Sequence, residues 1–201
     1  TLMLENGRVL AQGRTKDIIA MYFKSNSQEE GLFEIGRVDE SEIVVIKQSK
    51  LLNQAGTVTN NFEFGDSLTI EVELECTEYI KAPYFVVIVR TINGSLFGAT
   101  GMLDGFRPES LKVGINKVKC TFFNPQLLPG TYYFHMGIRA EDGLTLLTKS
   151  KDVGTFNVLG SLAEKGLNGT LADSLVNDAI SPLVPYQWEF ENGQIYNFNS
   201  K

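Results

Sequence analysis

Residues 68–76 carry the pattern that most constrains the fold. In this stretch, LTIEVELEC, every second side chain is apolar and the side chains between them are threonine or glutamate. Because successive side chains of a β-strand point to opposite faces of the sheet, the pattern predicts a strand with one buried and one solvated face. We therefore expect a sheet that is packed on one side and wet on the other.

Comparable short apolar or alternating stretches recur along the chain, separated by turn sequences such as Asn93-Gly94 and Pro129-Gly130. The further strands that they predict lie at 42–52, 84–91, 95–101, 113–123, 131–140, 144–149 and 153–159. No helical pattern separates them. So many short strands at this spacing favour an all-β, immunoglobulin-like antiparallel β-sandwich over a parallel sheet.

The first 24 residues have a different pattern. Two short apolar runs flank Asn6-Gly7, which predicts a β-hairpin, and Thr15 is placed to cap an amphipathic helix. The polar stretch 24–31, KSNSQEEG, resembles a flexible linker. We therefore divide the chain into residues 1–24 with hairpin and helix, a linker at 25–31, and a sandwich at 32–201.

The C-terminal part contains one more predicted strand, VPYQWEF at 184–190, after a connector at 161–178 that is expected to form a loop with one or two helical turns. Alternation puts Trp188 on the same face as Tyr186 and Phe190, so it is expected to anchor a core or an interface rather than to stack on a sugar. The long connector allows this strand to return to its own sheet or to reach a neighbouring subunit.

Composition excludes several classes of protein. With 24 acidic and 18 basic residues the net charge is -6, so no basic field is available to hold nucleic acid. No segment approaches 18 consecutive apolar residues and no signal peptide is recognisable, which predicts a soluble, non-exported chain. Cys76 and Cys120 are expected to be buried, reduced thiols, with an inter-sheet disulfide as the alternative.

The sequence contains no phosphate-binding loop, nucleophile elbow, zinc-protease motif, Cys-x-x-Cys pair or calcium loop. We predict no catalytic residue, no metal site and no cofactor. The single histidine, His135, lies inside a predicted strand, where a side chain on a sheet face is the simplest interpretation. The row Glu71, Glu73 and Glu75 is expected to be a solvated face, although paired carboxylates for glycoside cleavage remain an alternative.

Several phrases carry a resemblance to a known family. The opening LENGRVLAQG and TKDIIAMYF resemble the C-terminal end of an ABC-transporter nucleotide-binding domain. The later phrases are similar to the C-terminal carbohydrate-binding domain of Wzt, the ATPase subunit of O-antigen polysaccharide exporters. They are FEIGRVDESEIVVIKQSKLLNQAG, FEFGDSLTIEVELEC, INGSLFGATG, LLPGTYYFHMGI and VPYQWEF, and they span most of residues 31–190.

The resemblance implies an immunoglobulin-like sandwich that forms a homodimer, partly by exchanging its last strand. It also implies recognition of the non-reducing terminus of an O-antigen polysaccharide, without catalysis, which licenses export. An upstream ATPase domain would connect the chain to the transmembrane exporter subunit. The implied location is cytoplasmic, at the inner face of the bacterial inner membrane.

Strand alternation also suggests a binding face. In TYYFHMGIR and PYFVVIVRT the more apolar set should point inward. The outward set then supplies aromatic rings for the apolar faces of pyranoses, and arginine forks for hydroxyl, carboxylate or phosphate oxygens. The predicted carbohydrate-binding residues are Tyr84, Arg90, Tyr133, His135 and Arg139, with Gly137 leaving room between them.

The loop MLDGFRPES supplies further candidates in Asp104, Phe106 and Arg107, against the alternative of a plain surface loop. Three functions are therefore open. A glycan-binding module is favoured, a protein-interaction or structural sandwich that docks transporter subunits is the alternative, and a carbohydrate-active enzyme fragment is the third.

Overall fold

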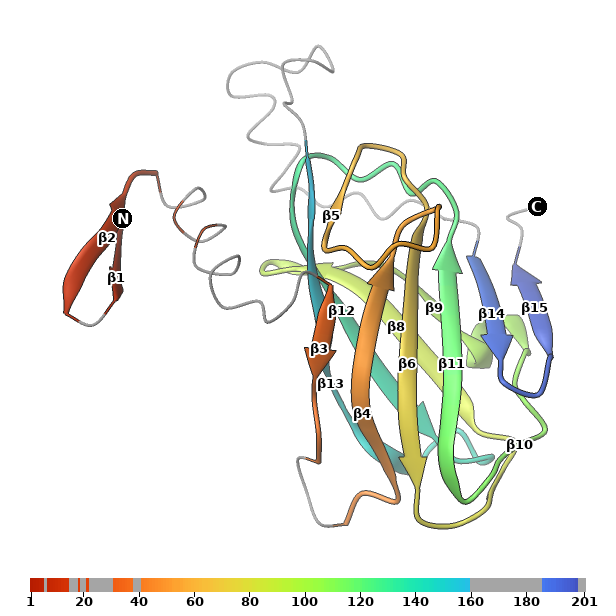
Figure 1. The fold of residues 1–201 in the computed structure, drawn as a ribbon. Helices are drawn as coiled ribbons and strands as arrows, with labels where there is room; N and C mark the ends of the chain where they lie inside the picture. The colour runs from red at the N-terminus through yellow and green to blue at the C-terminus, as the bar shows by residue number, and fades with distance from the viewer. Residues whose placement is uncertain are drawn as a thin grey trace.

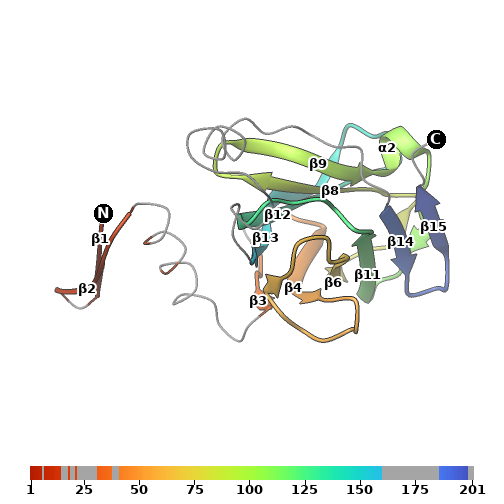
Figure 2. The same ribbon diagram turned by 90° about the horizontal axis from the view of Figure 1, so that it is seen from above.

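Two mainly antiparallel sheets packed face to face form the main body of the protein (Figure 1). A computed structural model describes residues 1–5, 7–14, 18, 21, 31–37, 41–159 and 186–198. Figure 2 shows β8, β9, β12 and β13 as one layer over β3, β4, β6 and β11. The predicted all-β sandwich is confirmed.

One sheet has six strands in the order β15-β14-β11-β6-β4-β3, and every neighbouring pair in it is antiparallel. Its strands are β3 (Leu32–Glu34), β4 (Val44–Leu52), β6 (Leu68–Cys76), β11 (Gly114–Phe122), β14 (Tyr186–Phe190) and β15 (Ile195–Phe198). The alternation of 68–76 is realised in β6, where apolar side chains are buried and those between them are half-buried.

The other sheet has five strands in the order β5-β13-β12-β8-β9. Its strands are β5 (Asn61–Phe62), β8 (Tyr84–Thr91), β9 (Gly94–Thr100), β12 (Gly130–Arg139) and β13 (Leu146–Val158). Only β5 pairs in parallel, with the end of β13. Strand β8 has the bounds predicted from the sequence.

The core lies between the two sheets and is rich in aromatic rings. Phe134 packs 5.0 Å from Phe156 and 6.2 Å from Phe122, measured between ring centroids. Trp188 is 1% exposed and lies 5.7 Å from Phe85. Burial of large rings of this kind dominates the energetics of a core.

Short elements complete the described structure. They are the hairpin β1 (Leu2–Glu5) and β2 (Arg8–Gln12), the small sheet of β7 (Ile80–Lys81) and β10 (Ser110–Leu111), and helix α2 (Gly101–Asp104). The hairpin was predicted, and Gly7 takes the positive φ of 76° that its turn needs. Most of the helix predicted after Thr15, and the 24–30 part of the linker, lie outside the described residues.

The prediction of two separate strands at 144–149 and 153–159 is wrong. Strand β13 is continuous and contains 13 residues, whereas its partner β12 contains 10, and three register shifts between the strands absorb the three extra residues. Such β-bulges place two consecutive residues on one face. Leu147 with Thr148, and Val153 with Gly154, are buried pairs of this kind, and they interrupt the alternation without ending the strand.

The C-terminal strand β14 pairs with β11 of the same chain, and Trp188 packs into the core as an anchor. The turn after Phe190 leads into β15, which the sequence did not predict. Residues 160–185, including the connector and Val184, are not among the described residues. Cys76 and Cys120 are buried free thiols in neighbouring strands of one sheet, so the inter-sheet disulfide does not form.

Candidate functional site

The five predicted binding residues lie on two paired strands of the five-stranded sheet. Strand β12 is antiparallel to β8, and the register sets Tyr133 opposite Arg90 and Arg139 opposite Tyr84. The residues that alternate with them point into the core and are at most 2% exposed: Phe85, Val87, Val89, Phe134, Met136 and Ile138. Because neighbouring side chains of a strand face opposite ways, the five predicted residues lie on the outer face.

Arg90, Tyr133, His135 and Asp152 form a first group, called here the arginine–histidine group. Asp152 comes from β13, and its two carboxylate oxygens lie 3.2 Å from Arg90 Nη2 and 3.0 Å from His135 Nδ1. Arg90 and Asp152 are about two-fifths exposed, at 40% and 43%. The group therefore combines a carboxylate acceptor with guanidinium and imidazole donors that solvent can reach.

Tyr133 is more covered than its outward position predicted, because only 8% of its surface is exposed. It is nevertheless absent from the core cluster between the sheets. Burial, and then the Asp152 carboxylate, raise the pKa of Tyr133, while Arg90 lowers it. The net direction is upward, so the phenol is a protonated hydrogen-bond donor at neutral pH.

Tyr84, Arg107 and Arg139 form a second group, called here the tyrosine–arginine group. The Arg107 guanidinium lies over the Tyr84 ring, 4.7 Å from the ring centroid, a cation–π geometry. Arg107 also donates to the carbonyl oxygens of Ala82 and Glu141, at 3.4 and 3.3 Å. An arginine held in this way presents a fixed fork beside an aromatic ring.

The turn after β12 positions Arg139, which donates from Nη1 to the Leu144 carbonyl at 3.0 Å. Asp142 fixes this turn by accepting from the backbone N–H groups of Leu144 and Thr145 and from the Thr145 hydroxyl. These bonds, led by that from the Thr145 hydroxyl, lower the pKa of Asp142. The Asp142 carboxylate is therefore ionised at neutral pH, and its hydrogen bonds hold the turn in one conformation.

The two groups are separated along the strands. Tyr133 and Arg139 are six positions apart in β12, which corresponds to about 20 Å at the usual rise of a strand. The half-buried side chains of Val86 and Ile88 lie between them. Gly137 also lies between them, but a Cβ there would clash with the Ser150 hydroxyl, so β13 occupies the room that the sequence predicted.

The outer face of the six-stranded sheet has a different character. Its glutamates and lysines alternate across β4, β6 and β11 and form ion pairs: Lys47–Glu75, Lys50–Glu71, Lys117–Glu73 and Lys119–Glu71. The row of Glu71, Glu73 and Glu75 is thus a solvated, charge-paired face, as expected. Aromatic and arginine side chains gather instead on the five-stranded sheet.

Comparison with known protein families shows which family this chain belongs to. The family model described as "Wzt C-terminal domain" matches residues 37–170. The chain belongs to the Wzt C-terminal domain family. The fold agrees, because a crystal structure of the C-terminal domain of Wzt superposes with a TM-score of 0.51 at 15% identity, covering 67% of this chain and 81% of that one. No match was found among curated proteins.

Membership of the Wzt C-terminal domain family confirms the resemblance to Wzt, with the match at residues 37–170, and indicates a role in O-antigen ABC transport. Within the described ranges, no three His, Cys, Asp or Glu side chains are grouped as a metal site. The same residues include no helix long and apolar enough to cross a membrane.

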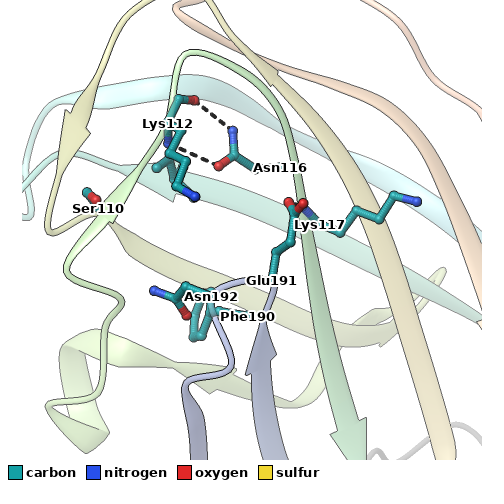
Figure 3. Close-up of a pocket in the computed structure, with 8 residues that line it drawn as sticks. Ser110, Lys112, Asn116, Lys117, Phe190, Glu191 and Asn192 are labelled. Atoms are coloured by element: carbon teal, nitrogen blue, oxygen red, sulfur yellow. Dashed lines mark hydrogen bonds between the residues drawn. The ribbon is translucent and has the colours of Figure 1, made fainter.

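A small pocket lies on the six-stranded side, where the β14–β15 turn meets β10 and β11 (Figure 3). Its volume is about 50 Å³, and Asn116 and Asn192 are among the residues that line it. Pockets for small molecules typically enclose about 300–1,000 Å³, so this one suits a few waters rather than a sugar ring. Asn116 is already engaged with the Lys112 backbone, as donor and as acceptor.

The other candidates from the sequence have structural contacts. In the 102–110 loop, Asp104 accepts from the Phe106 backbone N–H at 2.8 Å, and Phe106 stacks on Tyr196 with ring centroids 5.0 Å apart. Arg107 joins the tyrosine–arginine group. Asp152 contacts both Arg90 and His135, but sequence reasoning missed it. The bulges of β13 break the regular alternation, so the sequence pattern did not show that Asp152 faces outward.

Proposed function

We propose that this Wzt C-terminal domain is a non-catalytic module that binds the non-reducing terminus of an O-antigen polysaccharide on the outer face of its five-stranded sheet. The observation that carries the proposal is the register of β8 and β12, which gathers Tyr84, Arg90, Tyr133, His135 and Arg139 on one face. The half-buried Tyr84 ring and the polar forks together provide a stacking surface and the hydrogen bonds that a pyranose needs.

The charges of the site favour hydroxyl groups as ligands. Arg90 is paired with Asp152, so its positive charge is largely compensated, and the same carboxylate faces His135. A carboxylate beside a guanidinium offers an acceptor and donors at adjacent positions, which matches neighbouring sugar hydroxyls. The separation of about 20 Å between the two groups implies that a ligand contacting both spans several sugar units.

The proposed context is a homodimeric subunit at the cytoplasmic face of the inner membrane, in which an upstream ATPase domain connects the module to the transmembrane exporter. Residues 1–24 would be the end of that ATPase domain, 25–31 a linker and 32–201 the glycan-binding unit. Binding of a finished polysaccharide end would then license export.

Calorimetric titration with the O-polysaccharide of the source strain, intact and with its terminal residue removed, tests this function. We expect saturable binding to the intact polymer that is lost on terminal trimming and weakened about tenfold or more by Arg90→Ala or Arg139→Ala. Lys119→Ala is the matched control, because Lys119 is a partly exposed, ion-paired cation on the opposite sheet. If the Arg90 and Arg139 variants bind the polysaccharide as tightly as the Lys119 control, the proposed binding face is wrong.

The alternative is a module that docks transporter subunits without touching glycan. Exposed apolar side chains beside the tyrosine–arginine group favour it, since Leu103 and Leu144 are 88% and 79% exposed. In that case the titration would show no heat with any polysaccharide, and Leu103→Ser with Leu144→Ser would weaken association with the exporter complex. Shortening of the polysaccharide during the titration would instead reveal an enzyme.

A further inference from the structure

A β-bulge in β13 determines which residues reach the outer face beside His135. Phe134 pairs with Gly154, but His135, the next residue of β12, pairs with Asp152, so Val153 is the extra residue. Val153 and Gly154 are both buried, whereas Asp152 is exposed. In a regular ladder Val153 would lie opposite His135 and would share its outer face. Because of the bulge, Asp152 rather than Val153 lies opposite His135 on the outer face and joins the arginine–histidine group.

A bulge leaves backbone groups without their regular partners in the ladder, and buried groups of this kind need another partner. Here the partner comes from the opposite sheet. Ser49, in β4, is 0% exposed, and its hydroxyl donates to the Val153 carbonyl. A buried serine at an inward position of a strand is otherwise costly, so its hydrogen bond to the bulge accounts for its place there.

The packing around the bulge leaves little freedom. A Cβ at Gly154 would lie 3.3 Å from a methyl group of Leu51 and 3.5 Å from the Phe33 ring, so β13 approaches the opposite sheet closely at this point. A second buried group, Glu42, holds the preceding part of β13. It accepts from the Thr148 hydroxyl and the Lys149 N–H, both at 3.0 Å, and pairs with Lys151 at 3.4 Å.

We propose that Ser49 is a positioning residue for the outer-face site: its hydrogen bond to the Val153 carbonyl holds the bulge that sets Asp152 against His135 and Arg90. Ser49 itself lies between the sheets and touches no ligand. Its effect passes through the strand register, because a one-residue slip of β13 would turn Asp152 away from the outer face. The inference rests on the proposed glycan site for its functional meaning, but its structural part can be tested separately.

The single histidine provides the readout. A carboxylate only accepts hydrogen bonds, so neutral His135 must carry its proton on Nδ1 while Asp152 faces it. The ¹⁵N chemical shifts of the two ring nitrogens at pH 8 report this arrangement, and Asp152→Ala, which removes the acceptor, gives the reference for a histidine without it. We expect Ser49→Ala to move both shifts at least halfway toward the Asp152→Ala values. It should also reduce affinity for the O-polysaccharide by at least half as much, in free energy, as Asp152→Ala does.

Ser67→Ala is the matched control, because Ser67 is also a buried serine whose hydroxyl donates a hydrogen bond, in this case to the Asn124 side chain away from β13. It should leave the His135 shifts unchanged. Where Ser49→Ala does not fold, Ser49→Cys keeps the size of the side chain with a weaker donor and should move the shifts part of the way.

Wild-type shifts in a folded Ser49 variant would overturn the proposal. That result is independent of whether the wild-type protein binds glycan, which only the titration decides. Shifts that move as expected, with no glycan binding by the wild type, would contradict the proposed function and leave the positioning of Asp152 established.

Discussion

Replacement of Asp152 by asparagine separates a binding role from a structural one. The substitution keeps the shape of the side chain and one acceptor oxygen but removes the charge that faces Arg90 and His135. Because Arg90 and Asp152 are 40% and 43% exposed, water and salt screen their pair, and such pairs contribute about 0.2–1 kcal/mol to stability. The free energy of unfolding should therefore fall by no more than about 1 kcal/mol.

The expected loss of binding is larger. A hydrogen bond to a charged group contributes about 1.5–3 kcal/mol when it forms in a desolvated contact, which corresponds to about 10- to 150-fold in Kd. The carboxylate would accept a sugar hydroxyl in the bound state, so its removal acts on the complex more than on the free protein. A large change in affinity with a small change in stability is the predicted signature.

Both quantities can be measured on one protein preparation. Urea unfolding is followed by the emission of Trp188, the only tryptophan, which is 1% exposed in the folded state and becomes hydrated on unfolding. Binding is followed by calorimetry with the O-polysaccharide. Glu71→Gln is the matched control, because Glu71, like Asp152, contacts two basic side chains, here Lys50 and Lys119, but on the opposite sheet.

The reasoning is refuted by the reverse pattern. If Asp152→Asn lowers the unfolding free energy by about 3 kcal/mol, as loss of a buried ionic partner would, and leaves Kd unchanged, Asp152 is a structural residue. The outer face of the five-stranded sheet would then lose its central acceptor as a ligand group.

Three further predictions concern the core, the assembly and the titrating groups. Trp188→Ala should lower the unfolding free energy by about 3–5 kcal/mol, measured by circular dichroism in urea, because it removes a fully buried ring that packs on Phe85; a loss below about 1 kcal/mol would place the indole outside the core. Deletion of residues 184–201 should convert the proposed dimer to monomers in light scattering, because the proposed exchange joins the subunits through the last strand, provided that circular dichroism shows the truncated sandwich to be folded; a surviving dimer would place the interface elsewhere. Burial raises the pKa of Cys76 to about 11 and that of Tyr132 to about 12, above 9.0 and 10.0 for the unfolded chain. The unfolded chain then loses protons first as the pH rises, so stability should fall from about pH 9 upward, and a flat urea midpoint between pH 8 and 11 would contradict that burial.

The fold and the binding face differ in how far local sequence determines them. The alternation in 68–76 and 84–91 predicted β6 and β8 with their observed bounds. Together with the alternation in 131–140, it also predicted the outward positions of Tyr84, Arg90, His135 and Arg139. A pleated strand turns successive side chains to opposite faces, so the order of residues alone specifies the face.

Other features required the assembled sandwich. The burial of Tyr133 and the pairing of Arg90 with Asp152 depend on which side chains of the neighbouring strands lie on the same face of the sheet. Strand β15 was missed because its few residues form a strand by pairing with β14. The short segment 195–198 offers no independent signal of the required length.

Sequence by itself thus determined the class of fold, the core face of each regular strand and the family, because these follow from periodicity and from the order of residues. Tertiary structure decided the bulges of β13, and with them the arrival of Asp152 beside His135. The physical reason is that the bulge at Val153 is held by Ser49, more than one hundred residues away in the chain, through a hydrogen bond that exists only when the two sheets are packed together.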